Sequence, residues 1–450
     1  MRTLLLGVAC CLCACPPRVP SDAGAADTAP VVDASAPVDA PPDAAPAGCF
    51  VVPRPAGVAA GSVDTGFAGI GYATQGFTGA YTMAVAGAVQ DDCRVLVGGY
   101  AEGLSFVARY LADGTLDASF GDAGVLELPR TDTLDFVLDR LLILPDGSIL
   151  GVGFAGTASR RMALTHLGSD GAIDPSAAYG GVTLVSGVGP YGDPLAVGMD
   201  SLGRLILGAR RQNGTNLEYV IVRAGLDGAA DTTFGVGGET IIPGEIVARD
   251  LRVLPDDRIV VAGEHYGVIE YEVGAGAVEL LPDGTINTGF GSAGVAAVLV
   301  ESGVYKEIDR VELSGERLLL SGWTTLDPQR FLLVGVTDGG LLDTGFGVGG
   351  AATIDVGIHW GTELVVQPDG KIVVAGTGHD ERQTLARFEP DGGVDTSFGT
   401  GGFAKGPGIV AKSYPHDLQI GPDGRLFVVG HSEANDGVTP MQGYVARFWL

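Results

Sequence analysis

The chain has 450 residues, of which 46% are hydrophobic, with 73 glycines and 25 prolines. This composition supplies enough apolar material for a large core and too many turn formers for a bundle of helices, so global disorder and an all-helical fold are excluded. The 54 acidic residues outnumber the 27 basic ones and give a formal net charge of −27. Such a surface repels phosphate, so we expect no nucleic-acid partner.

The first residues indicate export. Met1-Arg2 supplies a positive start, and residues 3–14 form an apolar stretch of signal-peptide length that is too short to span a bilayer. The string Leu12-Cys13-Ala14-Cys15 resembles a bacterial lipobox, in which the cysteine after a small residue is lipidated. We therefore predict a signal peptide over 1–14 and lipidation at Cys15, with Cys10 as the alternative. A metal site at Cys10 and Cys13 is disfavoured because this segment is expected to be removed.

Residues 15–48 follow as a tether built almost wholly of Pro, Ala, Asp, Ser and Val, with no aromatic residue and little to bury. Linkers of this kind look like those of bacterial envelope lipoproteins. The expected location is therefore the cell envelope, as an outer-membrane lipoprotein that is periplasmic or surface-exposed and that reaches the membrane through its lipid anchor. Cys49 and Cys93 remain in the mature body, and in an oxidising compartment we predict a disulfide between them.

The body, 49–450, repeats one unit seven times. A turn-rich corner such as LDASFGDAG (116–124) or VDTSFGTGG (394–402) recurs about every 55 residues, and its aromatic residue falls at Phe67, Phe120, Tyr179, Phe234, Phe290, Phe346 and Phe398. A second landmark, a tight turn of the Pro-Asp-Gly kind, keeps the same spacing at Asp91-Asp92, Asp146-Gly147, Leu202-Gly203, Asp256-Asp257, Gly315-Glu316, Asp369-Gly370 and Asp423-Gly424.

Each unit is predicted to contain four short strands. The third is apolar on both faces, as in IVVAG (259–263 and 372–376) and LFVVG (426–430), so each sheet must be covered on both sides. Four-stranded sheets repeated at this length predict an all-β fold, a seven-bladed β-propeller of four-stranded antiparallel blades that closes into a ring. Two frames remain open: either the strand after the corner is innermost and each blade is continuous, or the two termini share one blade.

The corner pattern LxxDGxLDxxFGxxG is similar to that of the delta-60 repeat family, a bacterial propeller family whose members mostly lack an assigned activity. The resemblance covers Ser62 to Leu450. It departs from the family pattern in the third unit, where Tyr179 replaces phenylalanine, and in the first, which lacks Asp-Gly before the corner.

Antiparallel strands place the tight turns and corners on one face and the longer loops on the other. The longer loops are predicted to hold five of the six histidines, while His166 lies within a strand. Loops on a rigid scaffold usually carry binding, so we expect a small-ligand or glycan site there, although polar loops need no ligand. The candidate ligand-binding residues are His265, Trp323, His359, Trp360, His379, His416 and His431.

Other motifs carry little chemistry. The GxGxxG strings do not open a helix after a strand, and no P-loop, GxSxG or HExxH string occurs, so we predict no cofactor and no metal. Paired corner aspartates such as Asp113 with Asp117 or Asp391 with Asp395 could hold calcium, but turn chemistry explains them more simply. The leading interpretation is a non-catalytic platform for a glycan or protein ligand. The alternative is a propeller enzyme, a hydrolase or lyase of extracellular polysaccharide or peptide.

Overall fold

The computed structural model describes residues 49, 51–75, 81–128, 130–131, 134–156, 160–174, 181–186, 194–213, 216–266, 273–299, 306–324, 329–356, 358–409, 412–434 and 439–450. All of them belong to one compact unit, Ala47–Leu450. The predicted signal peptide (1–14), the tether (15–48) and Cys15 lie outside the described residues. Within the described ranges no helix has the length and apolar character needed to cross a membrane.

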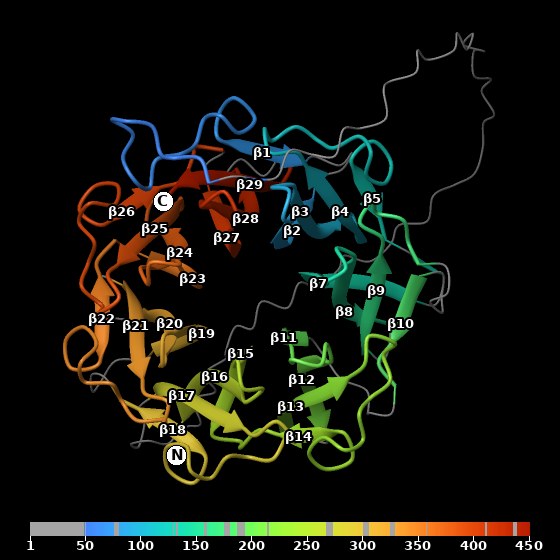
Figure 1. The fold of residues 1–450 in the computed structure, drawn as a ribbon, viewed down its shortest axis with the longest axis vertical. Helices are drawn as coiled ribbons and strands as arrows, with labels where there is room; N and C mark the ends of the chain where they lie inside the picture. The colour runs from blue at the N-terminus through green and yellow to red at the C-terminus, as the bar shows by residue number, and fades with distance from the viewer. Residues whose placement is uncertain are drawn as a thin grey trace, which may run out of the picture. The chain divides into compact units, whose positions relative to one another are not determined.

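Seven antiparallel sheets surround a common centre and confirm the predicted seven-bladed propeller (Figure 1). The strands of each blade are given from the centre outward. Blade 1 consists of β2 (Thr82–Val89), β3 (Val95–Ala101), β4 (Leu104–Tyr110) and β5 (Val125–Glu127), and blade 2 of β7 (Leu134–Ile143), β8 (Ile149–Ala155), β9 (Arg161–Leu167) and β10 (Val182–Leu184). Blade 3 consists of β11 (Pro194–Met199), β12 (Leu205–Asn213), β13 (Asn216–Ala224) and β14 (Glu239–Ile241). The short β6 (Arg130–Thr131) pairs with the inner strand β7.

Blade 4 consists of β15 (Ile246–Val253), β16 (Ile259–Tyr266), β17 (Val273–Leu280) and β18 (Val295–Val298), and blade 5 of β19 (Lys306–Ser314), β20 (Arg317–Thr324), β21 (Arg330–Val336) and β22 (Ala351–Ile354). Blade 6 consists of β23 (Ile358–Val366), β24 (Ile372–Gly378), β25 (Gln383–Phe388) and β26 (Phe403–Lys405). Blade 7 consists of β27 (Lys412–Ile420), β28 (Arg425–Glu433), β29 (Gln442–Trp449) and, outermost, β1 (Tyr72–Gln75).

The order of strands decides between the two frames. The strand after each corner is outermost, so the termini share blade 7, where β1 pairs with β29 from Tyr72 opposite Ala446 to Gln75 opposite Gly443. The segment before β1 adds backbone hydrogen bonds, including one of 2.7 Å from the Gly61 amide to the Trp449 carbonyl. Ring closure thus joins the two ends of the described unit and gives blade 7 four strands, as in the other blades apart from the additional β6 of blade 2.

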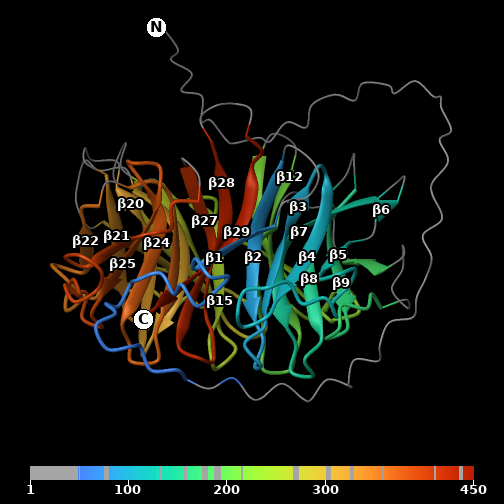
Figure 2. The ribbon, with the colours of Figure 1, turned by 90° about the horizontal axis from the view of Figure 1, so that it is seen from above.

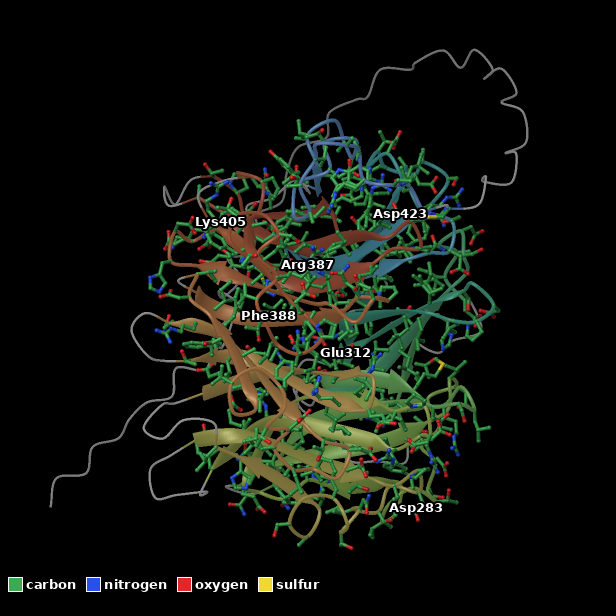
Figure 3. All side chains as sticks on the ribbon, turned by 60° about the vertical axis from the view of Figure 1, so that its left-hand side comes forward. Asp283, Glu312, Arg387, Phe388, Lys405 and Asp423 are labelled. Atoms are coloured by element: carbon green, nitrogen blue, oxygen red, sulfur yellow. A yellow bond between two sulfur atoms is a disulfide. The ribbon has the colours of Figure 1, made fainter. Side chains whose placement is uncertain are left out.

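The corner motif connects neighbouring blades. In blade 1 the Arg109 guanidinium lies 4.6 Å from the ring centroid of Phe120 and binds Asp117 at 2.8 Å, while its other end donates to the carbonyl of Ser169 in blade 2. Asp117 also accepts a hydrogen bond from the Ser119 amide. The same arrangement recurs in blade 6, where Arg387 lies over Phe398 and binds Asp395 (Arg387 is labelled in Figure 3). The recurring aspartate and phenylalanine of the sequence are therefore explained by cation–π and ion-pair contacts.

His166 occupies the corresponding position in blade 2. It lies in β9 opposite Leu150, just as Arg109 lies opposite Leu96 and Arg223 opposite Ile206. Its Nε2 is 2.7 Å from the carbonyl oxygen of Leu226 in blade 3. This histidine therefore holds two blades together, in agreement with its predicted place within a strand.

A β-bulge in the inner strand explains a glycine within the second strand of five blades. In blade 4 the register shifts between Ala248 and Asp250, which leaves Arg249 as the extra residue. The bulge brings the carbonyl of Val247 over Gly263, where an added Cβ would lie 1.9 Å from that oxygen. Gly99, Gly153, Gly322 and Gly430 face inner-strand carbonyls at 1.7 to 2.1 Å in the same way. At these five glycines an added Cβ would collide with the inner strand, whereas blade 3 has Ala209 at the corresponding place, opposite Pro194.

We expect Gly263→Ala to lower the free energy of unfolding by about 1 to 3 kcal/mol, because the methyl group must displace the Val247 carbonyl within a packed blade. The matched control is Gly244→Ala. Gly244 has no heavy atom within 4 Å of the position of an added Cβ, and we expect a change within about 0.5 kcal/mol. Urea unfolding followed by tryptophan fluorescence measures both; equal midpoints for the two variants would contradict the prediction.

Candidate functional site

The turns between inner and second strands and the corners share one face of the propeller, the turn face. The loops between second and third strands and the connections to the next blade share the other, the loop face (Figure 2). His265, Trp323 and His431 lie near the ends of β16, β20 and β28 at the loop face. They belong to strands, not to loops as the sequence suggested, because the second strands extend beyond their glycines. His416 likewise lies inside the inner strand β27.

Several of the predicted residues are not brought together. His265 is buried in β16 between Ile246 and Gly274, and its Nδ1 has no hydrogen-bond partner in the described part of the chain. Trp323 is buried in blade 5, where it lies in β20 opposite Glu307 of β19, while His379 is exposed in the turn after β24 of blade 6. His359 and Trp360 belong to β23, but their side chains lie outside the described part of the structure.

His416 and His431 do come together. Nε2 of His416 lies 2.7 Å from Nδ1 of His431, and the two rings stack with their centroids 4.9 Å apart. Tyr414 stacks on His431 in turn, at a centroid distance of 4.8 Å, and its hydroxyl donates to Glu433. The three rings form a row on blade 7, the imidazole stack. His416 is the bulged residue of β27, since the register shifts between Pro415 and Asp417.

Both imidazoles are neutral at neutral pH. Burial, the neighbouring His431 and the charges of Arg310 and Arg140 lower the pKa of His416 to about 3, and burial lowers the pKa of His431 to about 4. With one proton shared across the 2.7 Å contact, one ring donates and the other accepts. The pair is therefore a neutral hydrogen-bonding unit and not a cationic one.

The inner strands of blades 4 to 7 also carry charged side chains; we call the centre of the ring, which these strands surround, the central channel. Arg310 of blade 5 binds both carboxylate oxygens of Glu363 in blade 6, at 2.6 and 2.8 Å. Asp309 of blade 5 accepts hydrogen bonds from the backbone amide and hydroxyl of Thr362 at 2.9 Å. Each contact connects consecutive inner strands, which lie next to the centre of the ring in Figure 1. We call these groups the channel belt.

The channel belt continues through backbone contacts. Asp250 of blade 4 accepts a hydrogen bond from the Val311 amide of blade 5, and Asp417 of blade 7 accepts one from the Gly87 amide of blade 1. Burial raises the pKa values of Asp309 and Asp417, and it raises that of Glu363 to about 8 against the opposing charge of Arg310. The carboxylates of the channel belt are thus held by neighbouring blades at a cost in desolvation.

Sequence reasoning missed the channel belt. Its members lie five or six residues before the tight-turn landmarks, and a charged residue in that place was the available signal. The bulge hides the signal, because one extra residue moves a side chain from a sheet face into the channel.

The imidazole stack should shape the response of stability to pH. A folded pKa below the unfolded value of about 6.5 means that the unfolded chain binds more protons, so this contribution to stability is lost as the pH falls below 6.5. Glu363, whose pKa is raised, acts in the opposite sense below pH 8. We therefore compare the wild type with His416→Gln. Between pH 7 and pH 5 the wild type should lose about 2 kcal/mol more free energy of unfolding than the variant. Parallel pH profiles from urea unfolding would refute this.

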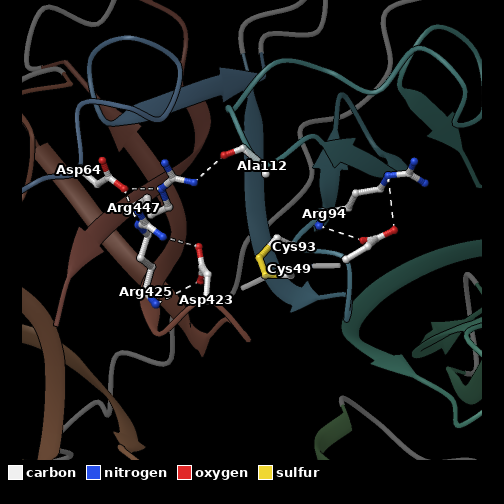
Figure 4. The surroundings of a disulfide bond; sticks show 9 residues. Cys49, Asp64, Cys93, Arg94, Ala112, Asp423, Arg425 and Arg447 are labelled. Carbon is white, nitrogen blue, oxygen red and sulfur yellow. Dashed lines mark hydrogen bonds and ion pairs between the residues drawn. A yellow bond between two sulfur atoms is a disulfide. The ribbon is translucent and has the colours of Figure 1, made fainter. Parts of the chain in front are cut away.

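The described residues contain one group of three side chains close enough to hold a metal ion, Cys49, Cys93 and Asp423. Its two cysteines are joined in a disulfide, with their Cα atoms 5.4 Å apart (Figure 4). The corner aspartates considered for calcium have other partners: Asp117 binds Arg109, and Asp395 binds Arg387 and Lys371.

Three segments of the chain, 90–120, 254–290 and 367–398, match the family model described as a domain of unknown function (DUF5122) beta-propeller. The matches support a bacterial β-propeller repeat family. No curated protein matches the chain. Among solved structures the chain is similar to virginiamycin B lyase from Staphylococcus aureus, with 11% identity over 83% of this chain and 98% of that one and a TM-score of 0.50.

Two further solved structures are similar at lower scores. The polysaccharide lyase Uly1 has 12% identity over 82% of this chain and 90% of that one, with a TM-score of 0.48. A periplasmic gluconolactonase from Pseudomonas aeruginosa has 12% identity over 69% of this chain and 82% of that one, with a TM-score of 0.43. Likeness at such identity concerns the fold alone.

Proposed function

We propose that the protein is a non-catalytic binding module whose ligand enters the central channel from the loop face and contacts the imidazole stack. The observation that carries the proposal is the contact between His416 and His431, which joins two of the predicted ligand-binding residues at the channel. Within the described residues, neither His416 Nδ1 nor His431 Nε2 makes a hydrogen bond. Two ring nitrogens, which we call the open nitrogens, therefore keep their hydrogen-bonding capacity for a ligand.

The channel belt favours binding over catalysis. Glu363 is already engaged by Arg310, and Asp309 and Asp417 by backbone amides of the next blade. Carboxylates that hold blades in register are poorly placed to exchange protons with a substrate. Their role is to keep the channel rigid around the imidazole stack.

The test is a binding screen of glycans, peptides and small polar metabolites on the purified propeller, followed by titration of each hit with His416→Leu and His431→Leu. Each variant should weaken binding at least about tenfold, since each removes an open nitrogen. His379→Ala, which changes an exposed histidine outside the channel, is the control and should bind as the wild type does. Unchanged affinity in both channel variants would remove the site.

A second candidate function is a propeller enzyme, a hydrolase or lyase of polysaccharide or peptide. The observation that favours it is that His416 is neutral at neutral pH and is hydrogen-bonded to a second histidine, as a general base oriented by a partner would be. Turnover of any substrate that is lost in His416→Leu would establish it, whereas saturable binding without turnover supports the binding module.

We further propose that the repeats belong to the delta-60 family and that Cys15 anchors the protein to the outer membrane, with the propeller held in the periplasm or at the cell surface. The disulfide between Cys49 and Cys93 supports an oxidising compartment. Labelling cells with a palmitate analogue checks the anchor: the wild type should carry the label, and Cys15→Ser should lack it. An unlabelled wild type would refute lipidation.

A further inference from the structure

The hydrogen-bonding pattern of the imidazole stack restricts what can bind to it. If His416 donates from Nε2 to His431, then His416 Nδ1 is a bare acceptor and His431 Nε2 carries a proton. If His431 donates instead, the roles at the two open nitrogens are reversed. In either state the pair offers a ligand one donor and one acceptor, and the two states differ both in the proton of the 2.7 Å contact and in the proton on the outer ring nitrogens.

Different ligand groups match this pattern to different degrees. A hydroxyl both donates and accepts, so hydroxyl groups satisfy both nitrogens in either state. A carboxylate only accepts and leaves the bare nitrogen unpaired, while an ammonium only donates and leaves the N–H unpaired. A peptide amide has a fixed donor and a fixed acceptor, so it matches one state and excludes the other. Leaving a polar atom without a partner in a closed site costs affinity.

The charges around the channel also favour a neutral ligand over an anionic one. The arginines near it are paired, Arg310 with Glu363, Arg249 with Glu264 and Arg140 with Asp139, and Asp250, Asp309 and Asp417 accept hydrogen bonds from backbone amides of the next blade. Each of these three arginines already has a carboxylate partner, and the neutral imidazoles supply no counter-charge, so an anionic ligand finds no unpaired positive charge among these groups. Tyr414 adds an aromatic ring at the outer end of the stack.

We infer that the ligand is a neutral, hydroxyl-rich molecule of the carbohydrate class, bound through hydroxyl groups to His416 Nδ1 and His431 Nε2. The inference rests on the proposed binding function and narrows it, because an acidic sugar, a phosphate ester or a cationic peptide would each be a poorer ligand at this site.

The experiment uses the full propeller, Ala47–Leu450, and defined probes: maltohexaose, cellohexaose, mannohexaose and galactohexaose as neutral sugars, hexagalacturonate as the acidic one, and an uncharged Ser/Gly-rich hexapeptide. Isothermal titration calorimetry at pH 7 gives the dissociation constants. We expect a neutral hexaose to bind at least tenfold more tightly than hexagalacturonate and the hexapeptide. His416→Leu and His416→Asn should weaken the neutral sugar about tenfold or more, and His379→Ala should not.

The outcomes separate the inference from the proposed function. Preference for hexagalacturonate, or absence of binding by all four neutral hexaoses, overturns the inference. If the peptide binds instead and His416→Leu abolishes that binding, the binding module stands and the carbohydrate class falls. If a neutral sugar binds equally well to the wild type and to His416→Asn, both the inference and the channel site fail. A thermal midpoint close to that of the wild type shows that each variant is folded.

Discussion

Removal of residues 444–450 is expected to abolish soluble expression. These residues form most of β29, which pairs with β28 on one side and with the closing strand β1 on the other. Deletion leaves β28 with an unpaired edge and removes the buried side chains of Tyr444 and Phe448 from the core between blades 6 and 7. Exposed strand edges and apolar cores promote aggregation.

Loss of β29 also breaks an ion cluster of blade 7. Asp64, which enters from the N-terminal side, lies 2.9 Å from Arg447 and 2.7 Å from Arg425, and all three side chains are nearly inaccessible to solvent (Figure 4). Without Arg447 the charge of Asp64 is poorly compensated in a buried place. The soluble fraction after expression at low temperature measures the effect, with removal of Leu450 alone as the control. A soluble, cooperatively melting 1–443 chain would contradict ring closure through β29.

Loss of the disulfide is the second large effect. Cys49 and Cys93 enclose a chain separation of 44 residues, and a crosslink of that span is worth about 4 kcal/mol in the chain-entropy account. We expect Cys49→Ala, or dithiothreitol acting on the wild type, to lower the free energy of unfolding by about this amount in urea. Dithiothreitol should not affect the variant further.

Cys93 offers a matched variant. It has a φ of 66° at the place in its turn that Gly147 and Gly370 take in other blades. Cys93→Gly removes the same crosslink but places a glycine in a left-handed conformation, so it should be less destabilised than Cys49→Ala by about 0.5 to 1 kcal/mol. If the two variants unfold at the wild-type urea midpoint, the disulfide makes no contribution to stability.

Much of the fold is predictable from sequence because turns carry local signals. The corner with its aspartate and phenylalanine recurs at the same spacing as the tight turn. Seven copies of the two signals predict seven blades. The frame is not local: whether Val125–Glu127 pairs with β4 or begins a new blade depends on contacts between chain segments that no turn specifies. The sequence therefore left both frames open, and the pairing of β1 with β29 decides between them.

The site was predictable in part. Placing histidines at the loop face followed from alternating strand direction, and it included the pair that meets, His416 and His431. Strand direction alone could not distinguish His416 and His431 from His265 or His379. The contact of the pair depends on a one-residue bulge in β27, in which His416 is the extra residue and has no paired residue in β28. Asp309 and Glu363 were missed for the same reason.

The position of the disulfide has a mechanical consequence. The segment from Cys49 to β1 is attached to blade 1 at both ends: through Cys93 in the turn between β2 and β3, and through the backbone that continues into β2. A pull on the chain ahead of Cys49 is therefore transmitted through sulfur into blade 1, and it bypasses the four residue pairs that hold β1 on β29. Tension that would otherwise unzip the ring is borne by a covalent bond.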